Sequence, residues 1–515
     1  MNLSVDKHFK PLSSDMMKIL DHVETKFSPY KLQVKGAPLW PLLRIRWFFS
    51  EWARLYATQE SATISGSRLA RTWQQVSPWL RRVLDRRVLL PVKAEGHHHV
   101  DLVFFSDGIS FTNLEGTWFE RFCDPLIEQG KKLGLTSVLW TPTDLRQAVT
   151  KSVVFSFQPQ IAIKTLMAAI WAKFTREDFA VDLKNISDEV QSMGYEATQF
   201  SPGKMVIDAY RVRMLSDMFH RRLVLTSPRL ACIVNYYSLE GMAFVWACKR
   251  LGIPVVDLQH GVQGVCHPAY AGWKISDQNE DLPLVPGYFW VWSENEAQVI
   301  RRSINGTAHQ PYVGGNPWVE LWKADNATNP QIAELLKRGY TLKIRAEEKP
   351  VILITLQYGL SYSEQLEPLR ALITLAHENY VFWVRLHPMM RNRRNEVNQY
   401  LHVYPIEIDE VSDLPLHALL PYCNIHITHS SSTVIEAADY GILSLITTAF
   451  GAELFPEQLR AGMAKLVEGG ASEVYNTLQQ LDLGKRFLPV VRPSSESSLS
   501  GLLSFIENTA LGAKT

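Results

Sequence analysis

Short apolar runs alternate with amphipathic stretches along most of the chain after residue 100. Each run ends in polar or turn-forming residues, and many are followed by a segment whose apolar positions have helical spacing. Such runs are typical of strands that are buried on both faces of a parallel sheet. The runs cover residues 100–105, 137–140, 230–234, 255–258 and 288–292 in the first half of the chain, and residues 351–355, 381–386, 425–428 and 443–447 in the second.

The two groups of runs predict two parallel sheets in separate lobes. Val313 to Pro317 (VGGNP) stands between them and has the Gly and Pro content of a linker. A length of 515 residues also fits several domains better than one core. We therefore expect an α/β protein with two Rossmann-like parallel-sheet lobes that face a cleft. The expected domains are a helical basic N-terminal extension (1–95), an N-terminal lobe (96–312) and a C-terminal lobe (313–515).

Positive charge is concentrated at the start of the chain. Residues 1–90 hold 15 Lys and Arg against 7 Asp and Glu, whereas the remainder holds 38 against 45. Within the basic part, Pro38 to Leu55 and Trp79 to Leu90 mix Arg with large apolar residues at roughly helical spacing. This pattern fits an arm that rests on an anionic membrane surface. It fits equally a helical cap that packs on the main body, with its arginines in solvent.

Composition excludes several classes of protein. A net charge of +1 argues against a chain built mainly to hold nucleic acid, and the aromatic content argues against disorder. The longest apolar stretch, Ser152 to Phe174, is broken by glutamines and lysines, so we expect no transmembrane helix. The five scattered cysteines fit buried thiols in a reducing compartment, and His97 to His99 fit a solvated loop better than a metal site. With no secretory signal at the start, we expect a cytoplasmic protein.

Polar residues follow two strands of the second lobe, where ligands of open parallel sheets bind. One predicted strand holds Arg385 and ends in His387-Pro388, with Arg391 shortly after it. Another predicted strand ends in a run of hydroxyl residues at the start of a helix, and such a helix start can bind phosphate. The structural alternative is N-capping of the helix, which would explain only one of these hydroxyl residues. The run consists of Ser430, Ser431, Ser432 and Thr433, and Glu436 one turn later is placed to accept bonds from ribose hydroxyls.

The first lobe offers candidates for acid–base chemistry. His260 and Gly261 follow one strand, Asp107 and Gly108 follow another, and Glu240 comes shortly after a third. A transferase that inverts an anomeric centre needs a carboxylate or His as base, and a retaining enzyme can use a carboxylate as nucleophile. Structural alternatives exist for two of them, because a lone His after a strand is often structural and Glu240 suits the first turn of a helix. Glu115 is a further candidate in the loop after Gly108.

Several short motifs occur together in a specific order: SDG (106–108), YYSLEG (236–241), LGIPVVDLQHG (251–261), VGGNP (313–317), RLHP (385–388) and HSSSTVIEAADYGILSLI (429–446). This set resembles bacterial capsule and O-antigen glycosyltransferases of the GT-B fold, a group that includes Kdo transferases and is related to sialyl- and polysialyltransferases. The resemblance covers about residues 100–460, so the basic N-terminal part lies outside it.

The resemblance implies roles for matching residues. A catalytic carboxylate falls on Asp107, contact with the donor nucleotide on His387 and Pro388, and phosphate binding on Ser430 to Thr433. The N-terminal lobe would then hold the acceptor and the C-terminal lobe the donor. The sialyltransferase-type motif has a second acidic residue where Ser106 stands, and QHG (259–261) is more typical of the capsule and Kdo-type enzymes. Neither a metal nor another cofactor is implied.

Together these features predict a metal-independent glycosyltransferase. It would move Kdo or another acidic sugar from a CMP-linked donor to a lipid-linked glycan acceptor in surface-polysaccharide synthesis. It would work in the cytoplasm, and its basic N-terminal region would touch the inner face of the membrane. Two alternatives stay open: polyol-phosphate transfer from a CDP-linked donor, and an inactive pair of lobes that scaffolds a polysaccharide synthesis complex.

Overall fold

The computed structural model describes residues 13–56, 99–145, 148–174, 180–274, 282–304, 309–323, 329–401, 404, 406–484 and 498–512. These residues form two compact units. The N-terminal unit comprises residues 14–54, the described residues from 99 to 317, and the last helix, α20 (Leu499–Gly512). The C-terminal unit comprises the described residues from 318 to 484.

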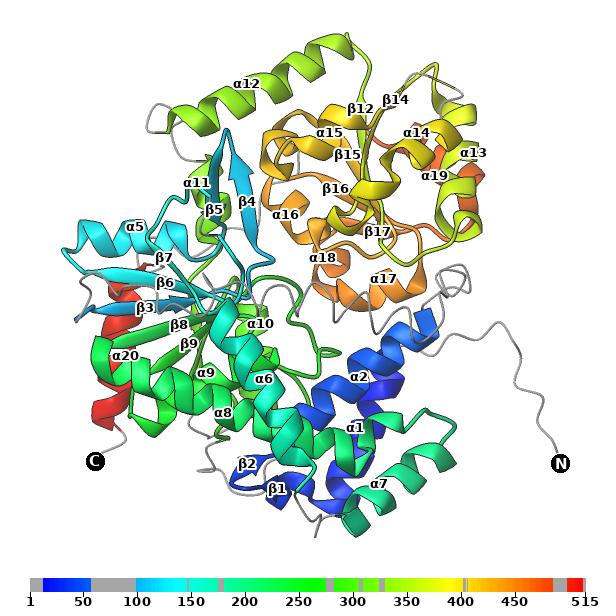
Figure 1. Cartoon of the computed structure of the whole chain (residues 1–515). Coiled ribbons are helices and arrows are strands. Elements are labelled where there is room, and N and C mark those ends of the chain that lie inside the picture. Colours follow the sequence, from blue (N-terminus) through cyan, green and yellow to red (C-terminus); the bar gives the residue numbers. More distant parts are fainter. Residues whose placement is uncertain are drawn as a thin grey trace, which may run out of the picture. The chain divides into compact units, whose positions relative to one another are not determined.

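A seven-stranded parallel sheet forms the centre of the N-terminal unit (Figure 1). Its spatial order is β11-β10-β9-β8-β3-β6-β7, which is the Rossmann order extended by one strand. The central strands are buried along their whole length because helices cover both faces. The strands are β3 (Leu102–Phe105), β6 (Ser137–Thr141), β7 (Val154–Ser156), β8 (Leu230–Val234), β9 (Val255–Leu258), β10 (Tyr288–Val291) and β11 (Gln310–Val313).

The helices of this unit connect its strands in sequence. They are α5 (Asp124–Lys132), α6 (Gln158–Ala172), α7 (Ala180–Ser192), α8 (Pro202–Thr226), α9 (Leu239–Arg250) and α10 (Glu294–Ser303). A separate antiparallel hairpin, β4 (Phe111–Leu114) and β5 (Thr117–Glu120), follows β3. Helix α20 returns from the end of the chain to this unit, where Leu499 N donates to Gln129 Oε1 of α5 at 2.9 Å. The predicted division placed this helix in the C-terminal lobe, and the contact with α5 explains the difference.

A six-stranded parallel sheet forms the centre of the C-terminal unit (Figure 1). Its order, β14-β13-β12-β15-β16-β17, is again the Rossmann order. The strands are β12 (Val351–Thr355), β13 (Val381–Arg385), β14 (Ile406–Glu407), β15 (Ile425–Thr428), β16 (Leu443–Ile446) and β17 (Ala464–Leu466). The helices are α11 (Pro317–Lys323), α12 (Pro330–Arg345), α13 (Glu367–Ala376), α14 (Arg394–Leu401), α15 (Asp409–Asp413), α16 (Thr433–Asp439), α17 (Ala449–Leu454), α18 (Pro456–Arg460) and α19 (Gly470–Gln480).

The predicted α/β class with two Rossmann-like parallel sheets is confirmed. All nine predicted strand runs form strands, and the structure adds four short strands to the two parallel sheets: β7, β11, β14 and β17. No helix in the described part of the chain is long and apolar enough to span a bilayer.

The start of the chain packs into the N-terminal unit. Helix α1 (Ser13–Phe27), strands β1 (Gln33–Val34) and β2 (Ala37–Pro38), and helix α2 (Trp40–Tyr56) form its first elements. Six large apolar side chains of α2 are at most 4% exposed: Trp40, Leu42, Leu43, Ile45, Trp47 and Phe48. The packing of these residues on the main body, as a helical cap, is therefore confirmed, and an arm with its apolar face on lipid is not. The expectation that the arginines of this helix lie in solvent is wrong for Arg44, whose side chain is fully buried. Trp79 to Leu90, His97 and His98 lie outside the described residues.

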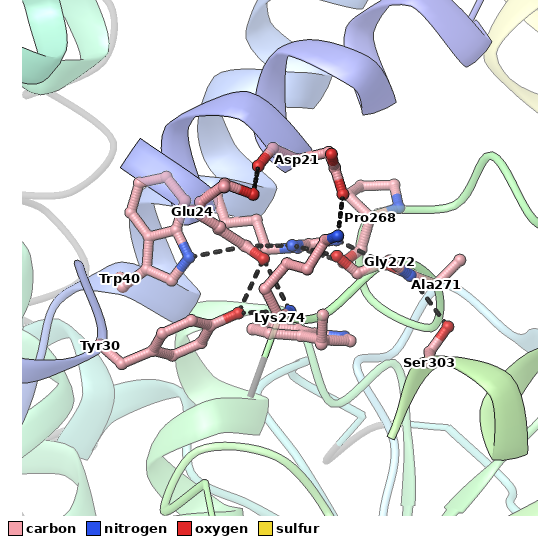
Figure 2. A network of polar contacts seen from close by, with 12 residues as sticks. Asp21, Glu24, Tyr30, Trp40, Pro268, Ala271, Gly272, Lys274 and Ser303 are labelled. Atoms are coloured by element: carbon pink, nitrogen blue, oxygen red, sulfur yellow. Dashed lines mark hydrogen bonds and ion pairs between the residues drawn. The ribbon is translucent and has the colours of Figure 1, made fainter. Parts of the chain in front are cut away.

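A buried ion pair fixes α1 and α2 to the unit (Figure 2). Arg44 of α2 pairs with Glu24 of α1, and both side chains are fully buried. Arg44 also donates to the carbonyl oxygens of Pro268, Ala271 and Gly272, and its guanidinium lies 4.4 Å from the Trp273 ring centroid. Because two buried charges and their hydrogen-bonding groups are satisfied together, the network holds both helices against the chain after β9.

The same carboxylate collects neutral donors from three directions. Glu24 accepts from Trp40 Nε1 and Tyr30 Oη at 2.8 Å each, and from Lys274 N at 2.8 Å. The buried pair thus has little unused hydrogen-bonding capacity, which is the condition under which such a pair is tolerated in a protein interior.

We expect Arg44→Met to lower the free energy of unfolding of the N-terminal unit by about 3–5 kcal/mol, because Glu24 would stay buried without its counter-charge. Lys18→Met on α1 is the matched control. Its exposed pair with Asp15 should contribute no more than about 1 kcal/mol. Urea unfolding followed by tryptophan fluorescence and circular dichroism measures both. Equal effects of the two substitutions would contradict the role given to the Arg44–Glu24 pair.

Candidate functional site

Each sheet has a switch point, where chain connections leave in opposite directions and ligands of such sheets bind. In the N-terminal unit it lies between β3 and β8, and in the C-terminal unit between β12 and β15. Asp107 follows β3 closely, and the Ser430 to Thr433 loop follows β15. The predicted residues therefore cluster at the two places where the topology favours binding.

The serine-rich loop of the C-terminal unit has one hydroxyl that closes the turn. Ser431 Oγ accepts from Thr433 N at 3.3 Å and donates to Thr433 Oγ1 at 3.0 Å, while Ser431 N donates to Thr428 Oγ1 at 3.2 Å. In the described part of the chain, the hydroxyls of Ser430 and Ser432 have no protein partner. Hydrogen bonds within the turn therefore engage Ser431 and Thr433. Ser432, at the N-cap of α16, makes no side-chain capping bond, so Ser430 and Ser432 are left for a ligand.

His387, which follows a strand of the same sheet, is held in one orientation. It follows β13, the strand that pairs with β12, and its Nδ1 accepts from Met389 N at 3.2 Å. Partial burial lowers its pKa, which favours the neutral ring. Since Nδ1 is an acceptor in a neutral ring, the proton lies on Nε2, which is left as a donor. Pro388 opens the short helix that positions this ring, and Tyr358, after β12, stacks on it at 6.1 Å between centroids.

The arginines near His387 divide between structure and solvent. Arg385 Nη1 donates to the carbonyls of Val411 and Leu414 at 2.5 Å each, so it secures the chain around α15. Arg393 pairs with Glu396, and Arg394 pairs with Asp413. Arg391 is exposed and has no hydrogen bond or ion pair among the described residues. Of the cations weighed from the sequence, Arg391 is therefore better placed than Arg385 to meet an anion in solvent.

Glu436 lies against an aromatic cluster. His417 Nε2 is 3.3 Å from Glu436 Oε1, and the rings of Trp318, Trp322 and Tyr440 lie 5.8–6.2 Å from the His417 ring. His417 is buried, whereas the Glu436 side chain is 15% exposed. Behind it, the buried His426 bridges Thr355 Oγ1 and Ser444 Oγ at 2.9 Å each, and burial lowers its pKa to about 3. A neutral, fixed core therefore supports the partly exposed Glu436 carboxylate.

Asp107 is oriented by two donors at the switch point of the N-terminal unit. Its Oδ1 accepts from Ile109 N at 2.9 Å, and its Oδ2 accepts from Asn235 Nδ2, after β8, at 2.8 Å. Gly108 has a φ of 89°, and a Cβ there would lie 1.7 Å from Thr143 Oγ1. Only glycine suits both this backbone conformation and this approach, so the Asp-Gly pair forms one structural unit.

A second carboxylate supports this loop, and sequence reasoning missed it. Glu120, from β5, is fully buried and accepts from Ser106 Oγ at 3.0 Å, while Gly108 N donates to the same Ser106 oxygen at 3.2 Å. Burial raises the pKa of Glu120. The sialyltransferase-type motif has an acidic residue where Ser106 stands. In this chain the carboxylate of Glu120, 14 residues further along, contacts that serine. The hairpin contact that brings it back left no pattern in the sequence.

His260 shares the region of Asp107. Its Nε2 lies 3.1 Å from Tyr237 Oη, and the Phe122 ring lies 6.3 Å from its own. Burial lowers the pKa of His260, and the negative charge of Asp107 opposes that shift. The ring is therefore favoured as the neutral imidazole, which can accept a hydrogen bond through its unprotonated nitrogen.

Glu240 has a different setting. It stands in the first turn of α9 and pairs with Arg211 of α8. No described hydrogen bond connects it with Asp107 or His260. The structure therefore places Glu240 in the contact between α8 and α9, as the helix-dipole alternative suggested. Glu115, at the tip of the β4–β5 hairpin with a φ of 47°, is part of the turn.

Aromatic rings from the N-terminal helix form a wall beside His260. Phe49 of α2 stacks on Tyr237 at 5.9 Å and meets the His267 ring edge-on at 5.5 Å. Tyr237 in turn contacts His260 at 5.7 Å. Part of the region assigned from the sequence to a separate extension thus contributes directly to the candidate site.

A buried carboxylate lies beneath this wall and was also missed. Asp257 of β9 accepts from Tyr270 Oη at 2.8 Å and from Tyr236 N at 3.2 Å. Burial raises its pKa to about 8. Only its position inside an apolar strand run (VVDL) hinted at a special role. Among the described residues, no group of three or more His, Cys, Asp or Glu is placed to hold a metal ion.

Comparison with known proteins gives structural likeness at low sequence identity. No protein-family model matches the sequence, and no curated protein matches it significantly. The fold is similar to UDP-GlcNAc 2-epimerase from Methanocaldococcus jannaschii, with 14% identity, a TM-score of 0.49, and coverage of 79% of this chain and 99% of that one. UDP-GlcNAc 2-epimerase from Neisseria meningitidis, bound to UDP-GlcNAc, has 16% identity and a TM-score of 0.48, and the match covers 79% of this chain and 99% of that one. The calicheamicin glycosyltransferase CalG4 has 12% identity and a TM-score of 0.39, and the match covers 74% of this chain and 90% of that one.

We expect Asp257→Asn to gain thermal stability relative to the wild type as pH rises from 5 to 9. Because the pKa of Asp257 is raised, the folded wild type keeps a proton that the unfolded chain releases above about pH 4. The stability that this bound proton contributes to the folded wild type is lost as pH rises through about 8. Asn keeps the site neutral at every pH. Melting temperatures at half-unit pH steps measure the difference.

Proposed function

We propose that the chain is a glycosyltransferase which takes a sugar from a nucleotide donor. The observation that carries this proposal is that each unit has a switch point lined by polar side chains, with a different chemistry in each. One has free hydroxyls, an Nε2–H donor and a carboxylate, and the other has an oriented carboxylate next to a neutral imidazole. The first set suits a nucleotide diphosphate or monophosphate, and the second suits deprotonation of an acceptor hydroxyl.

Donor binding is assigned to the C-terminal unit. Ser430 and Ser432 would donate to phosphate oxygens, and His387 Nε2–H would add a further donor without bringing a charge. Glu436 would accept from the ribose hydroxyls, held in place by His417. Fixed donors of this kind stabilise the negative charge that grows on the leaving phosphate, since they need no reorganisation during the reaction.

Acceptor activation is assigned to the N-terminal unit. Asp107 would accept the proton of the attacking hydroxyl, because its two oxygens are oriented by Ile109 N and Asn235. His260 is the neighbouring group able to relay or hold a proton. Phe49 and Tyr237 offer ring faces against which a sugar can pack. Glu240 is left out of the chemistry because Arg211 neutralises it.

The finer assignment follows from the motif order given above. We propose a CMP-linked acidic sugar such as Kdo as donor, and a lipid-linked glycan of a bacterial surface polysaccharide as acceptor. The neutral His387 and the exposed Arg391 suit a donor that carries few charges of its own, such as a nucleoside monophosphate with one sugar carboxylate.

We expect CMP or CDP to raise the melting temperature of the purified protein more than UDP, GDP or ADP does. A ligand at one hundred times its Kd stabilises the folded state by about 2.7 kcal/mol. Glu436→Gln should reduce the shift, because the amide replaces an acceptor of ribose hydroxyls with a partial donor. Glu348→Gln, at the amino edge of the same sheet, is the control. A larger shift with UDP or GDP would overturn the CMP assignment, and no shift with any nucleotide would contradict the transferase.

We expect Asp107→Asn to lower kcat by about 10²–10⁴-fold while nucleotide binding stays unchanged, since a general base contributes this much. The measurement is sugar transfer from CMP-Kdo to a lipid-linked acceptor, with CMP release and product mass both followed. Asp188→Asn should keep full activity. In a parallel assay with a CDP-polyol as donor, release of CMP together with a polyol-phosphate product would support the CDP-polyol alternative. Unchanged turnover in Asp107→Asn would exclude Asp107 as the base.

A further inference from the structure

Helix α6 of the N-terminal unit presents an apolar face to solvent. One side packs on α8 and buries Ile161 and Ala168, and Figure 1 shows the helix lying across α8. The other side exposes four large side chains: Leu166 at 40%, Ile170 at 48%, Trp171 at 54% and Phe174, just past the helix end, at 79%. A contiguous cluster of exposed apolar side chains marks an interaction surface, whereas single scattered ones are ordinary on protein surfaces.

The exposed residues form a continuous stripe. Ile163, Leu166, Met167, Ile170, Trp171 and Phe174 are spaced at i, i+3, i+4, i+7, i+8 and i+11. At about 100° per residue this spacing places all six on one side of the helix. Ile163 and Met167 are half-buried and join the exposed members along the stripe. The helix therefore has two apolar sides, of which α8 covers only one.

Charge borders the stripe with one sign only. Lys164 and Lys173 fall on its two opposite edges at the same helical spacing, and residues 158–174 contain no Asp or Glu. Long basic side chains on either edge can lie along apolar surface and extend their ammonium groups outward. An apolar stripe between two cations is complementary to a surface with an apolar interior and anionic headgroups.

We propose that α6 docks on the surface of an anionic lipid bilayer. The stripe enters the boundary between headgroups and acyl chains, with Trp171 at the level of the headgroups and Lys164 and Lys173 toward lipid phosphates. This assignment moves membrane contact away from α2, whose large apolar side chains are used in the core and whose Arg44 is bound to Glu24.

The start of α6 lies at the edge of the sheet that carries Asp107. Strands β3, β6 and β7 are neighbours, and Phe157 N, at the helix start, donates to Thr141 O at 2.8 Å. Thr141 and Thr143 in turn adjoin Gly108. A docked α6 therefore holds the Asp107 edge near the lipid surface, where a lipid-linked acceptor would be found. This last step rests on the proposed function, whereas the docking does not.

The test is sedimentation of the full chain with vesicles of phosphatidylglycerol and phosphatidylcholine, compared with phosphatidylcholine alone. We expect binding to the anionic vesicles, lowered at least about tenfold by the double substitution Trp171→Ser and Phe174→Ser. The double substitution Lys164→Glu and Lys173→Glu should lower binding to the anionic vesicles by at least about fivefold for each lysine replaced. It should also weaken the dependence of this binding on salt concentration. Ile344→Ser, a 59%-exposed position on α12, is the control and should leave binding unchanged.

Three results would overturn the proposal. The first is absence of binding to anionic vesicles, or binding that the Trp171 and Phe174 substitutions leave intact while the melting temperature is unchanged. The second is a wild-type dimer that these substitutions dissociate, since α6 would then be a contact between copies of the chain. The third is binding that depends instead on the basic segment Trp79 to Leu90, tested by replacing Arg81, Arg82, Arg86 and Arg87 with Glu. Vesicle binding needs no turnover, so a failure of the transferase assay leaves this test independent.

Discussion

The burial of both parallel sheets on their two faces determines where this protein can do chemistry. Strands such as β3, β8, β12 and β15 are buried at every position, so their side chains are committed to packing. Polar side chains can reach a ligand only beyond the strand ends, and the Rossmann order opens a space at one switch point in each sheet. Asp107 and the Ser430 to Thr433 loop occupy these two places. The candidate site is thus a consequence of topology, and the residues decide only which chemistry it supports.

Two helices of similar composition have opposite fates because their partners differ. Helices α2 and α6 both mix basic residues with Trp, Leu and Ile or Phe. In α2 a buried carboxylate, Glu24, accepts the charge of Arg44, so the helix enters the core and brings Phe49 to the site. In the described part of the chain, neither Lys164 nor Lys173 has an ion pair with an acidic residue, and the apolar side between them stays exposed. Composition alone therefore does not separate a core helix from a surface helix, because the contacts with other elements differ.

The strands and the residues after them could be predicted because both leave local patterns. Continuous apolar runs marked the nine main strands, whereas β7, β11, β14 and β17 are two to four residues long and carry too few positions for a pattern. Glu120, Asp257 and His417 were missed for another reason. Each acts through a partner distant in sequence, as Glu120 does with Ser106 and His417 does with Glu436. Glu120 and His417 also stand outside any recognisable motif. Likewise, only the folded chain shows that Arg385 and Glu240 are engaged by protein groups.

Burial drives most ionisable groups around Asp107 toward neutrality, and this gives Asp107 its distinct character. Desolvation raises the pKa of Glu120 and brings that of Asp124 to about 7 and that of Asp257 to about 8. It lowers the pKa of His260 and brings that of His267 to about 3. Near neutral pH the buried ionisable groups in this part of the unit therefore carry few charges. The half-exposed carboxylate of Asp107 is held among these groups by hydrogen bonds from Ile109 N and Asn235 Nδ2. Neutral donors on two sides therefore fix the orientation of both of its oxygens.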